Sequence, residues 1–530
     1  MEKIFKPKII DSLKGYSGKQ LASDLVAGLI VAIIALPLSI ALAIASGVSP
    51  EKGIYTAIVA GLVISLLGGS RVNISGPTAA FATIVAGIVA EFGIDGLVIA
   101  TLMAGIMLIL MGLLKFGSLI KYIPTTITVG FTGGIAVTIA IGQIKDFLGL
   151  TYPKGTHAVE TMEKAEAVIK SISTINWWGL IVGLIALLIL IVWPYINKKI
   201  PGSLIAVLVG SAIVKIFDLP VNTIGDLYSI GRDLPTFSFP QLNMDIISQL
   251  IPSAFTIAIL AAIESLLSCV VSDGMIGDKH NSNTELIAQG MGNICSGLFG
   301  GIPATGAIAR TAANVKNGGR SPVSGIVHAL VLMLILVVLM PYAAWIPMPV
   351  IAAILFIVAY NMSEWRSFVK LCKTAPITDI LVLIATFILT VVFDLVVAIA
   401  VGMIMAVVFF LKNMTDTTTT ESKTTEIMTI YKIKGPMFFA SADKWSDIKP
   451  LNDSDIITLD LSVVTFLDAS ATKSLFAILK RCKENGLKLM LAGVNEQPLK
   501  AMKKAKFTEA IGEENIWPEI EKLPEELHFR

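Results

Sequence analysis

The sequence has few charged residues and few of the residue types that metal sites and nucleic-acid interfaces need. Charged side chains make up only 15% of the 530 residues, against 55% hydrophobic ones, and only four cysteines and four histidines occur. Soluble domains carry about a quarter charged residues. The net charge of +2 provides no concentrated basic face, which excludes a nucleic-acid partner. The cysteines show no CxxC or other metal-like spacing, so we expect no metal and no cofactor.

The charged residues that are present are unevenly distributed. They are sparse between Asp24 and Leu411 and become frequent after Lys412, which indicates a membrane domain followed by a soluble one. The polar, basic start of the chain lacks an apolar region with a cleavage site, so it is interpreted as a cytoplasmic lead-in. Four parts are predicted: a cytoplasmic N-terminal segment (1–22), a transmembrane domain (23–412), a linker (413–425) and a cytoplasmic C-terminal domain (426–530).

Long apolar runs fill the first four fifths of the chain. A helix that spans a bilayer needs roughly 20 apolar residues, and about fourteen candidates of this kind can be counted. Those starting near Thr78 and Ala307 are short and interrupted by Gly and Pro, which is typical of discontinuous helices. The sequence therefore predicts an α-helical polytopic membrane protein. The candidate segments are 23–46, 54–68, 77–92, 95–114, 122–144, 176–196, 202–217, 250–272, 284–299, 307–316, 321–342, 347–361, 376–393 and 395–411.

The basic residues between these segments predict the orientation. Cytoplasmic loops carry an excess of Lys and Arg. With the N-terminus inside and about fourteen spans, every inner loop contains at least one basic residue and both termini are cytoplasmic. This pattern predicts a multi-pass protein of the inner (plasma) membrane. The basic residues of the inner loops are Arg71, Lys115, Lys121, Lys198, Lys199, Lys279, Lys316, Arg320, Arg366, Lys370 and Lys373, and Lys412 follows the last span.

The chain also resembles itself at an offset of 227 residues. Segment 35–39 (ALPLS) aligns with 262–266 (AIESL), and segment 75–80 (SGPTAA) aligns with 302–307 (IPATGA). A repeat of seven spans, an odd number, must place its two copies in opposite orientations. Inverted repeats are typical of secondary transporters, whose substrate site lies near the bilayer midplane at broken helices.

Each copy carries a Gly- and Pro-rich break before a short helix, VNISGPTAAFATIV in the first and GGIPATGAIARTAAN in the second. Gly76 and Gly306 allow the chain to turn and to approach a ligand, and Thr78 and Thr305 are candidate helix caps or ligand hydroxyls. Because the copies are inverted, the two helix N-termini are expected to face each other. Their N–H groups and dipole ends would then form an anion site.

Polar side chains within the apolar spans are further candidates, since a charge inside a span is costly and usually functional. Arg310, one turn after Gly306, either supplies positive potential to the substrate, forms a structural ion pair, or extends to the inner interface. Glu264 either carries a proton with the substrate, coordinates sodium together with Ser268, or forms a permanent ion pair with Arg310, and the proton is preferred over sodium. Ser39 is the polar residue of the wall that the first span would place opposite the breaks.

Two of these segments and the first span resemble a known family. DLVAGLIVAIIALPLSIALAIASGV, ISGPTAAFATIV and GGIPATGAIART are similar to the SulP family of anion permeases, and the similarity extends over nearly the whole chain. It implies a seven-plus-seven inverted repeat divided into core and gate domains, an elevator-type motion and a homodimer. Sodium-coupled bicarbonate members carry Asp where Glu264 stands and a hydroxyl near Ile308, which disfavours sodium and bicarbonate here. The resemblance assigns the substrate to Thr78, Ala79, Ala80, Gly306, Ala307 and Ile308.

The C-terminal part alternates strand-like and helix-like segments. IMTIYKIKG and MFFA are predicted as two strands, DIITLDLSVV and KLMLAG as buried strands, and FLDASATKSLFAILKRCKENG and NEQPLKAMKKAKF as segments that form helices. Such alternation predicts a small α/β layer. The segment resembles a STAS domain, in which a Ser at the start of one helix is phosphorylated. Ser470 occupies the matching position and is either a regulatory site or a helix cap.

The inverted repeat, the two breaks and the family resemblance predict secondary active transport of small anions, with sulfate as the first substrate and a proton as the coupling ion. The alternatives are a bicarbonate or C4-dicarboxylate symporter, a passive anion channel or exchanger, and a nucleobase transporter of similar architecture. No paired catalytic carboxylates or nucleophile motif suggests an enzyme, and His328 is interpreted as a satisfied packing residue. The expected partners are a small inorganic or carboxylate anion, the lipid bilayer, a second copy of the chain and a cytoplasmic regulator of the C-terminal domain.

Overall fold

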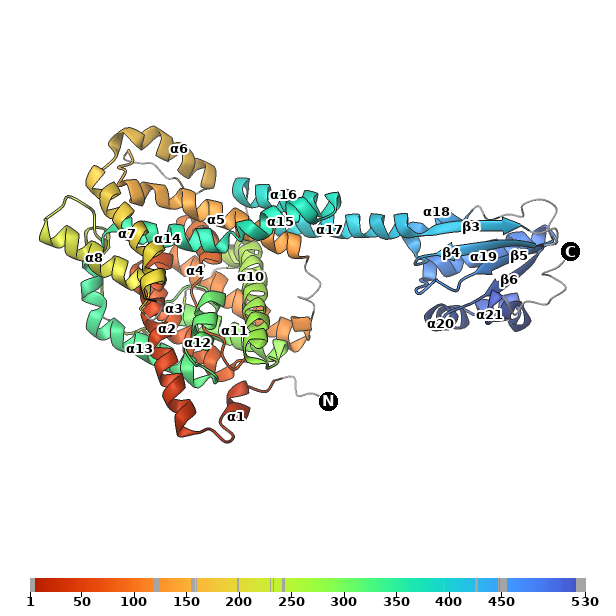
Figure 1. The fold of residues 1–530 in the computed structure, drawn as a ribbon, viewed down its shortest axis with the longest axis horizontal. Coiled ribbons are helices and arrows are strands. Elements are labelled where there is room, and N and C mark those ends of the chain that lie inside the picture. The colour runs from red at the N-terminus through yellow and green to blue at the C-terminus, as the bar shows by residue number, and fades with distance from the viewer. Residues whose placement is uncertain are drawn as a thin grey trace. The chain divides into compact units, whose positions relative to one another are not determined.

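The computed structural model describes residues 5–118, 124–153, 158, 160–197, 200–228, 230–231, 233–240, 244–393, 395–424, 428–446, 448 and 455–520. Lys121, Lys198 and Lys199 of the predicted inner loops lie outside the described residues, as does the predicted start of the C-terminal domain at Glu426. The chain divides into two compact units, Met1–Met403 and Ile404–Arg530, and each unit is considered by itself (Figure 1).

The helices of the first copy follow the predicted order. A short helix α1 precedes them, and a helix α6 lies in the long connection after α5. Their bounds are α1 (Lys8–Ser12), α2 (Gly18–Ala45), α3 (Pro50–Leu67), α4 (Ala82–Leu113), α5 (Thr125–Leu148), α6 (Thr161–Ser171), α7 (Trp177–Ile196) and α8 (Gly202–Ile216).

The helices of the second copy repeat this order after a short helix α9, and an additional helix α15 joins α14 to α16. Their bounds are α9 (Ile224–Leu227), α10 (Met244–Ile276), α11 (Ser282–Leu298), α12 (Ile308–Lys316), α13 (Val323–Leu339), α14 (Met348–Met362), α15 (Trp365–Thr374), α16 (Ile377–Val392) and α17 (Leu395–Thr417).

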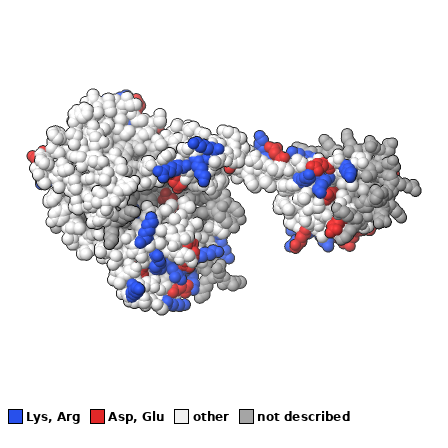
Figure 2. All heavy atoms as spheres, in the orientation of Figure 1, with Lys and Arg blue, Asp and Glu red and all other residues white. Residues whose placement is uncertain are grey.

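Each predicted apolar segment falls on a helix of the first unit, or on the start of α17. Among the described residues, nine helices are long and apolar enough to cross a membrane, and two shorter apolar helices, Gly202–Ile216 and Ile377–Val392, accompany them. The predicted segments 77–92 and 95–114 form the single helix α4, whose backbone breaks at Gly93 with φ 67°. Glycine adopts this left-handed conformation without the steric penalty of a Cβ atom. Charged side chains are sparse on the face shown in Figure 2 and gather on the side that carries α1 and α15.

Local sequence signals explain where several of these helices begin and end. Pro50 occupies the first turn of α3, where its missing N–H costs nothing. The Asn176 side chain accepts hydrogen bonds from Trp178 N (3.0 Å) and Gly179 N (3.1 Å) at the start of α7. Gly149 ends α5 in the left-handed conformation that helix C-termini favour.

The helices of the first unit pack in two groups. One group contains α2, α3, α4 and α10 to α13, in which α11 packs against α4 and α3, and α13 packs against α2 and α3. The other group contains α5, α7, α8, α14 and α16, in which α5 contacts both α14 and α16. Apart from α8 and α17, equivalent helices of the two copies therefore share a group, as the predicted division into core and gate domains requires.

The second unit is a five-stranded sheet with helices. The strand order is β3-β4-β5-β6-β7, with β3 antiparallel to β4 and the remaining pairs parallel. The predicted strand MFFA forms only an isolated bridge between Met437 and Leu467, followed by a turn of 3-10 helix. Residues 413–424, predicted as a linker, continue α17 to Thr417 and form β3. The bounds are β3 (Thr419–Thr424), β4 (Met428–Lys434), α18 (Asp443–Ser446), β5 (Ile456–Asp460), α19 (Ala469–Glu484), β6 (Lys488–Ala492), α20 (Glu496–Lys504), α21 (Phe507–Ile511) and β7 (Ile516–Trp517).

Candidate functional site

The two Gly-rich breaks meet at a two-stranded antiparallel pair. Strand β1 (Ser75–Gly76) pairs with β2 (Thr305–Gly306), with Ser75 opposite Gly306 and Gly76 opposite Thr305. This antiparallel register relates Gly76 to Gly306, an offset of 230 rather than 227 residues. Helix α10 continues to Ile276, four residues beyond the position that the offset of 227 gives for the end of α2, and the stretch from the helix end to the strand is one residue shorter in the second copy, so the net shift is three residues. The predicted convergence of the two breaks is therefore found, with the local alignment shifted.

A helix begins directly after each strand. After β1, Thr78 is the N-cap of a 3-10 turn that leads into α4, and after β2, Ala307 is the N-cap of α12. Within the described residues, the side chains of these two N-cap residues make no capping hydrogen bond. Uncapped first turns present backbone N–H groups and the positive end of the helix dipole, which is the arrangement that binds anions.

The hydroxyls of Thr78 and Thr305 do not cap the helices, which was one of the two roles considered from the sequence. The Thr78 hydroxyl donates a hydrogen bond of 3.0 Å to Glu264 Oε2, and the Thr305 hydroxyl donates one of 2.9 Å to the carbonyl of Ala261. Both contacts reach α10. Glu264, the predicted coupling residue, therefore lies beside the N-terminus of the first broken helix.

Arg310 is fully buried in the first turns of α12. Its Nη2 donates a hydrogen bond of 2.6 Å to the carbonyl of Pro77, while Nε and Nη1 have no hydrogen-bond partner in the described part of the chain. None of the ion pairs found among the described residues includes Arg310 or Glu264, so the alternative of a permanent pair between them is not seen. A buried cation without a carboxylate is costly and calls for another anion.

The other predicted substrate residues lie around the antiparallel pair of β1 and β2, which is called the β1–β2 crossing below. Ala79 and Ala80 form the buried start of the 3-10 turn, and Ile308 is the first residue of α12. The Ala307 N–H donates a hydrogen bond of 2.9 Å to Ile74 and extends the β1–β2 pair by one residue. Ser39 is buried in the middle of α2, and its hydroxyl has no partner among the described residues.

Ser268 belongs to a different polar group. Its Oγ lies 2.8 Å from Asn73 Oδ1 and 3.1 Å from Thr311 Oγ1, and its single proton is donated to one of these two oxygens, while the Thr311 hydroxyl donates to Asn73 Oδ1 (3.0 Å). Thr311 Oγ1 in turn accepts from the Ile74 N–H (3.0 Å). These bonds join α10 and α12 to the segment before β1, whereas Glu264 bonds to Thr78, so among the hydrogen bonds of the described residues none links the two residues of the sodium alternative.

A second buried carboxylate, Glu285, was not singled out from the sequence. Its Oε1 accepts hydrogen bonds from Asn73 Nδ2 (2.8 Å) and Gln289 Nε2 (3.0 Å), and its Oε2 accepts from the backbone N–H groups of Gly69 (2.8 Å) and Ser70 (3.2 Å). Four donors satisfy the carboxylate as an anion. The spacing of polar residues along α11, with Glu285 and Gln289 four apart, was the signal that could have revealed it.

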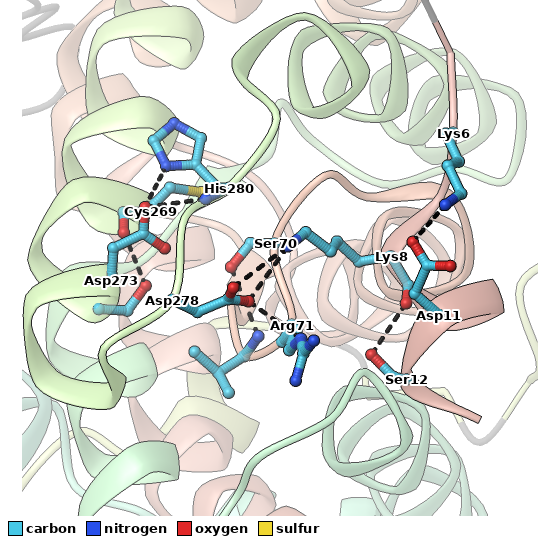
Figure 3. Close-up of polar contacts among 12 residues, drawn as sticks. Lys6, Lys8, Asp11, Ser12, Ser70, Arg71, Cys269, Asp273, Asp278 and His280 are labelled. Carbon is cyan, nitrogen blue, oxygen red and sulfur yellow. Dashed lines mark hydrogen bonds and ion pairs between the residues drawn. The ribbon is translucent and has the colours of Figure 1, made fainter. Parts of the chain in front are cut away.

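Ion pairs hold the loops around this group together. Lys8 Nζ and Arg71 Nε lie 3.1 Å and 2.9 Å from Asp278 Oδ2, and His280 Nδ1 lies 2.7 Å from Asp273 Oδ2 (Figure 3). Arg71 follows α3, and Asp278 and His280 connect α10 to α11. Asp278 therefore connects α1 and the loop after α3 to the loop between α10 and α11.

A buried carboxylate near the start of α2 fastens the N-terminal segment to the second copy. Asp24 accepts hydrogen bonds from the Tyr16 hydroxyl (2.6 Å), the Ser321 hydroxyl (2.5 Å) and the Arg320 N–H (2.8 Å). Burial and the hydrogen bond to Asp24 raise the pKa of Tyr16 to about 12. The Tyr16 hydroxyl therefore remains a hydrogen-bond donor throughout the physiological range.

In the second unit, Ser470 lies exposed in the first turn of α19. Asp468, not Ser470, caps this helix, because Asp468 Oδ1 accepts a hydrogen bond of 2.8 Å from the Ala471 N–H. Asp468 Oδ2 also accepts from the Phe439 N–H (2.9 Å). The regulatory interpretation of Ser470 stays a prediction, and the alternative of a capping role is wrong.

Comparisons with known protein families agree with this architecture. A family model described as the sulfate permease family matches residues 21–386, and a model of the STAS domain matches residues 419–523. The first covers most of the unit that contains the β1–β2 crossing, and the second covers the five-stranded sheet.

Individual relatives extend along nearly the whole chain. A putative sulfate transporter of Bacillus subtilis (strain 168), YvdB, is 41% identical and covers 95% of this chain and 97% of its own length. The bicarbonate transporter BicA of Picosynechococcus sp. is 29% identical, with 93% and 92% covered.

Two solved structures have a similar fold. The structure of SLC26A9 superimposes with a TM-score of 0.88 at 20% identity and covers 97% of this chain and 91% of that one. The transmembrane domain of a cyanobacterial BicA superimposes with a TM-score of 0.66 at 31% identity, with 72% and 98% covered.

Proposed function

Since the chain belongs to the sulfate permease family of anion transporters and ends in a STAS domain, we propose that it is a secondary active transporter of small anions. Sulfate is the first substrate and a proton is the coupling ion. The anion binds at the β1–β2 crossing, between the first turns of the helix after Thr78 and of α12. The two packing groups move relative to each other in an elevator-type cycle that exposes this crossing to alternate sides.

The observation that carries the proposal is the chemistry at the crossing. Two uncapped helix N-termini and a buried Arg310 with two unpartnered nitrogen atoms offer only hydrogen-bond donors and positive potential. A small oxyanion supplies the acceptors that these groups require. Bound there, it would also neutralise the guanidinium, which has no carboxylate partner among the described residues.

Glu264 is the group best placed to couple the anion to a proton. It is the carboxylate that contacts the crossing, through its hydrogen bond with Thr78. A negative Glu264 would repel an anion bound at the same helix N-terminus, and protonation would remove that repulsion. Proton and anion would therefore bind together, which is the requirement for symport.

Relatives support more than one substrate. The 41% identical B. subtilis relative is named a putative sulfate transporter, which favours sulfate. The relative BicA is named a bicarbonate transporter, which makes bicarbonate the alternative. A C4-dicarboxylate symporter and a passive channel or exchanger share the same scaffold. The proposal also places the protein in the inner (plasma) membrane with both termini cytoplasmic, as a homodimer whose STAS domain receives a regulatory partner.

The test is uptake of labelled sulfate, bicarbonate and succinate into proteoliposomes with and without an inward proton gradient. We expect sulfate to accumulate above its external concentration only with the gradient, and a protonophore to abolish the accumulation. Glu264→Gln should lose the response to the gradient, while Glu166→Gln, an exposed carboxylate on α6, should retain it. Gradient-driven accumulation by Glu264→Gln would exclude Glu264 as the coupling residue, and downhill flux alone in the wild type would indicate a channel or exchanger.

A further inference from the structure

His328 has no hydrogen-bond partner although it is completely buried. It lies on α13 at 0% exposure, and neither Nδ1 nor Nε2 has a partner within the described residues. The sequence suggested a satisfied packing residue, and the structure contradicts this. Buried polar atoms nearly always have a partner in the protein or an ordered water, and an exception needs an explanation.

The surroundings of His328 place it behind the β1 strand. A Cβ atom built on Gly61 of α3 would lie 3.8 Å from His328 Nδ1 and 3.2 Å from the carbonyl oxygen of Ser75. A Cβ atom built on Gly76 would lie 2.5 Å from Arg310 Nη1. Ser75 and Gly76 are the two residues of β1, so His328 and Arg310 border the same strand.

Arg310 and His328 also share a lack of hydrogen-bond partners, at two nitrogen atoms each, within the described residues. Both are buried, and between them they have four nitrogen atoms without a partner. Because each lies against β1, one small polar molecule would satisfy atoms of both.

Hydrogen-bond chemistry identifies that molecule. The free Nε and Nη1 groups of Arg310 are donors only, whereas a neutral imidazole has one donor and one acceptor nitrogen. An anion without hydrogen atoms would accept from Arg310 but would leave the imidazole acceptor unsatisfied. Water accepts from a guanidinium and donates to an imidazole, and buried waters bind at sites of this kind.

We propose that a buried water binds between Arg310 and His328, and that His328 is thereby a positioning residue for the guanidinium at the anion site. The water accepts from Nη1, the nitrogen that lies beside Gly76, while Nη2 donates to Pro77 and Nε remains available to the anion. His328 does not touch the transported anion and acts through Arg310. The transport readout of this inference rests on the proposed function, whereas the water itself can be detected independently.

Two substitutions distinguish a hydrated His328 from a packing residue. His328→Leu keeps a similar volume but removes both nitrogen atoms, and His328→Gln keeps one donor and one acceptor. Without a water, His328→Leu would relieve an unsatisfied burial and leave the protein equally or more stable. With the water, His328→Leu frees the guanidinium and should raise the KM for the anion about tenfold at a similar maximal rate, and His328→Gln should stay close to the wild type.

Leu332→Met, one turn further along α13 at another fully buried position, is the control for altered packing. An unchanged KM in His328→Leu would overturn the inference. If KM rose equally in His328→Leu and His328→Gln, or rose as much in Leu332→Met, the effect would be one of packing and the inference would be overturned as well.

Nitrogen-15 NMR of histidine-labelled protein tests the water without any transport assay. The chain has four histidines, so the difference between wild-type and His328→Leu spectra assigns the His328 signals, and His328→Gln serves if the leucine variant does not fold. We expect the chemical shift of a hydrogen-bonded acceptor nitrogen. The shift of a free acceptor nitrogen would refute the inference, and wild-type protein that transports no anion would refute the proposed function instead.

Discussion

A methyl group added at Gly306 should disrupt the proposed anion site. The Cβ atom of Gly306→Ala would lie 2.7 Å from Asn73 Nδ2, 2.9 Å from Asn73 Oδ1 and 3.0 Å from Ser265 Cα. Asn73 cannot move away easily, because its amide donates to Glu285 and accepts from Ser268. The strain must therefore displace β2 or break the hydrogen bonds of Asn73.

The size of the effect follows from the cost of overpacking. Inserting a methyl group into a packed core costs about 1–3 kcal/mol. If only the lower end of this range appears in substrate binding, KM rises about fivefold, since 1.4 kcal/mol corresponds to a factor of ten. The rest should appear as a lower temperature of unfolding.

The measurements are the concentration dependence of anion uptake in proteoliposomes and thermal unfolding followed by size-exclusion chromatography. Gly274→Ala is the matched control, because a Cβ atom at this glycine of α10 meets nothing within 4 Å. The control should transport normally and be equally or slightly more stable, as a helical Gly→Ala change generally is. If Gly306→Ala shows the KM and unfolding temperature of the wild type, the crossing is not the tight junction described above.

Two further changes test the groups that support the crossing and the second unit. Glu285→Gln places an amide NH2 against a pair of N–H donors and should lower the free energy of unfolding by about 1–3 kcal/mol. The change is measured as a lower unfolding temperature, and an unchanged temperature would contradict the four-donor arrangement. Asp468→Ala removes the cap of α19 and should destabilise the STAS domain by about 1–2 kcal/mol, measured by proteolysis of the full chain, whereas Ser470→Ala, which removes an exposed hydroxyl, should have little effect.

The fold was largely predictable because its signals are long and periodic. Apolar runs, Pro and Gly at helix ends and alternating strand and helix patterns predicted the long apolar helices of the first unit and strands β4, β5 and β6 of the second. Strand β3 (Thr419–Thr424) was missed because its TTESKT sequence has no apolar face, and its side chains are mostly exposed. It forms because its backbone pairs with β4, a tertiary effect that composition does not reveal.

The site was predictable in its location but not in its hydrogen bonds. Two Gly-rich breaks at equivalent positions of a repeat predicted the convergence of Gly76 and Gly306. The partners of Thr78 and Arg310 could not be predicted, because they depend on side-chain directions across the junction of the two copies. Glu285 was missed for a similar reason, since three of its four donors come from residues 69–73, more than 200 residues earlier.

The structural symmetry of the crossing is not matched by its chemistry. The register that relates Gly76 to Gly306 places Ala80 at the position equivalent to Arg310, and the alignment of α2 with α10 places Pro37 opposite Glu264. The guanidinium and the carboxylate thus both come from the second copy, while the first copy contributes backbone N–H groups and the Thr78 hydroxyl. If the site consisted only of two equivalent helix N-termini, both copies would contribute equally to anion binding. In the proposed function, one cation and one protonatable group in one copy would tie the charge of the loaded site to Glu264, so that the binding of an anion and the binding of a proton would depend on each other.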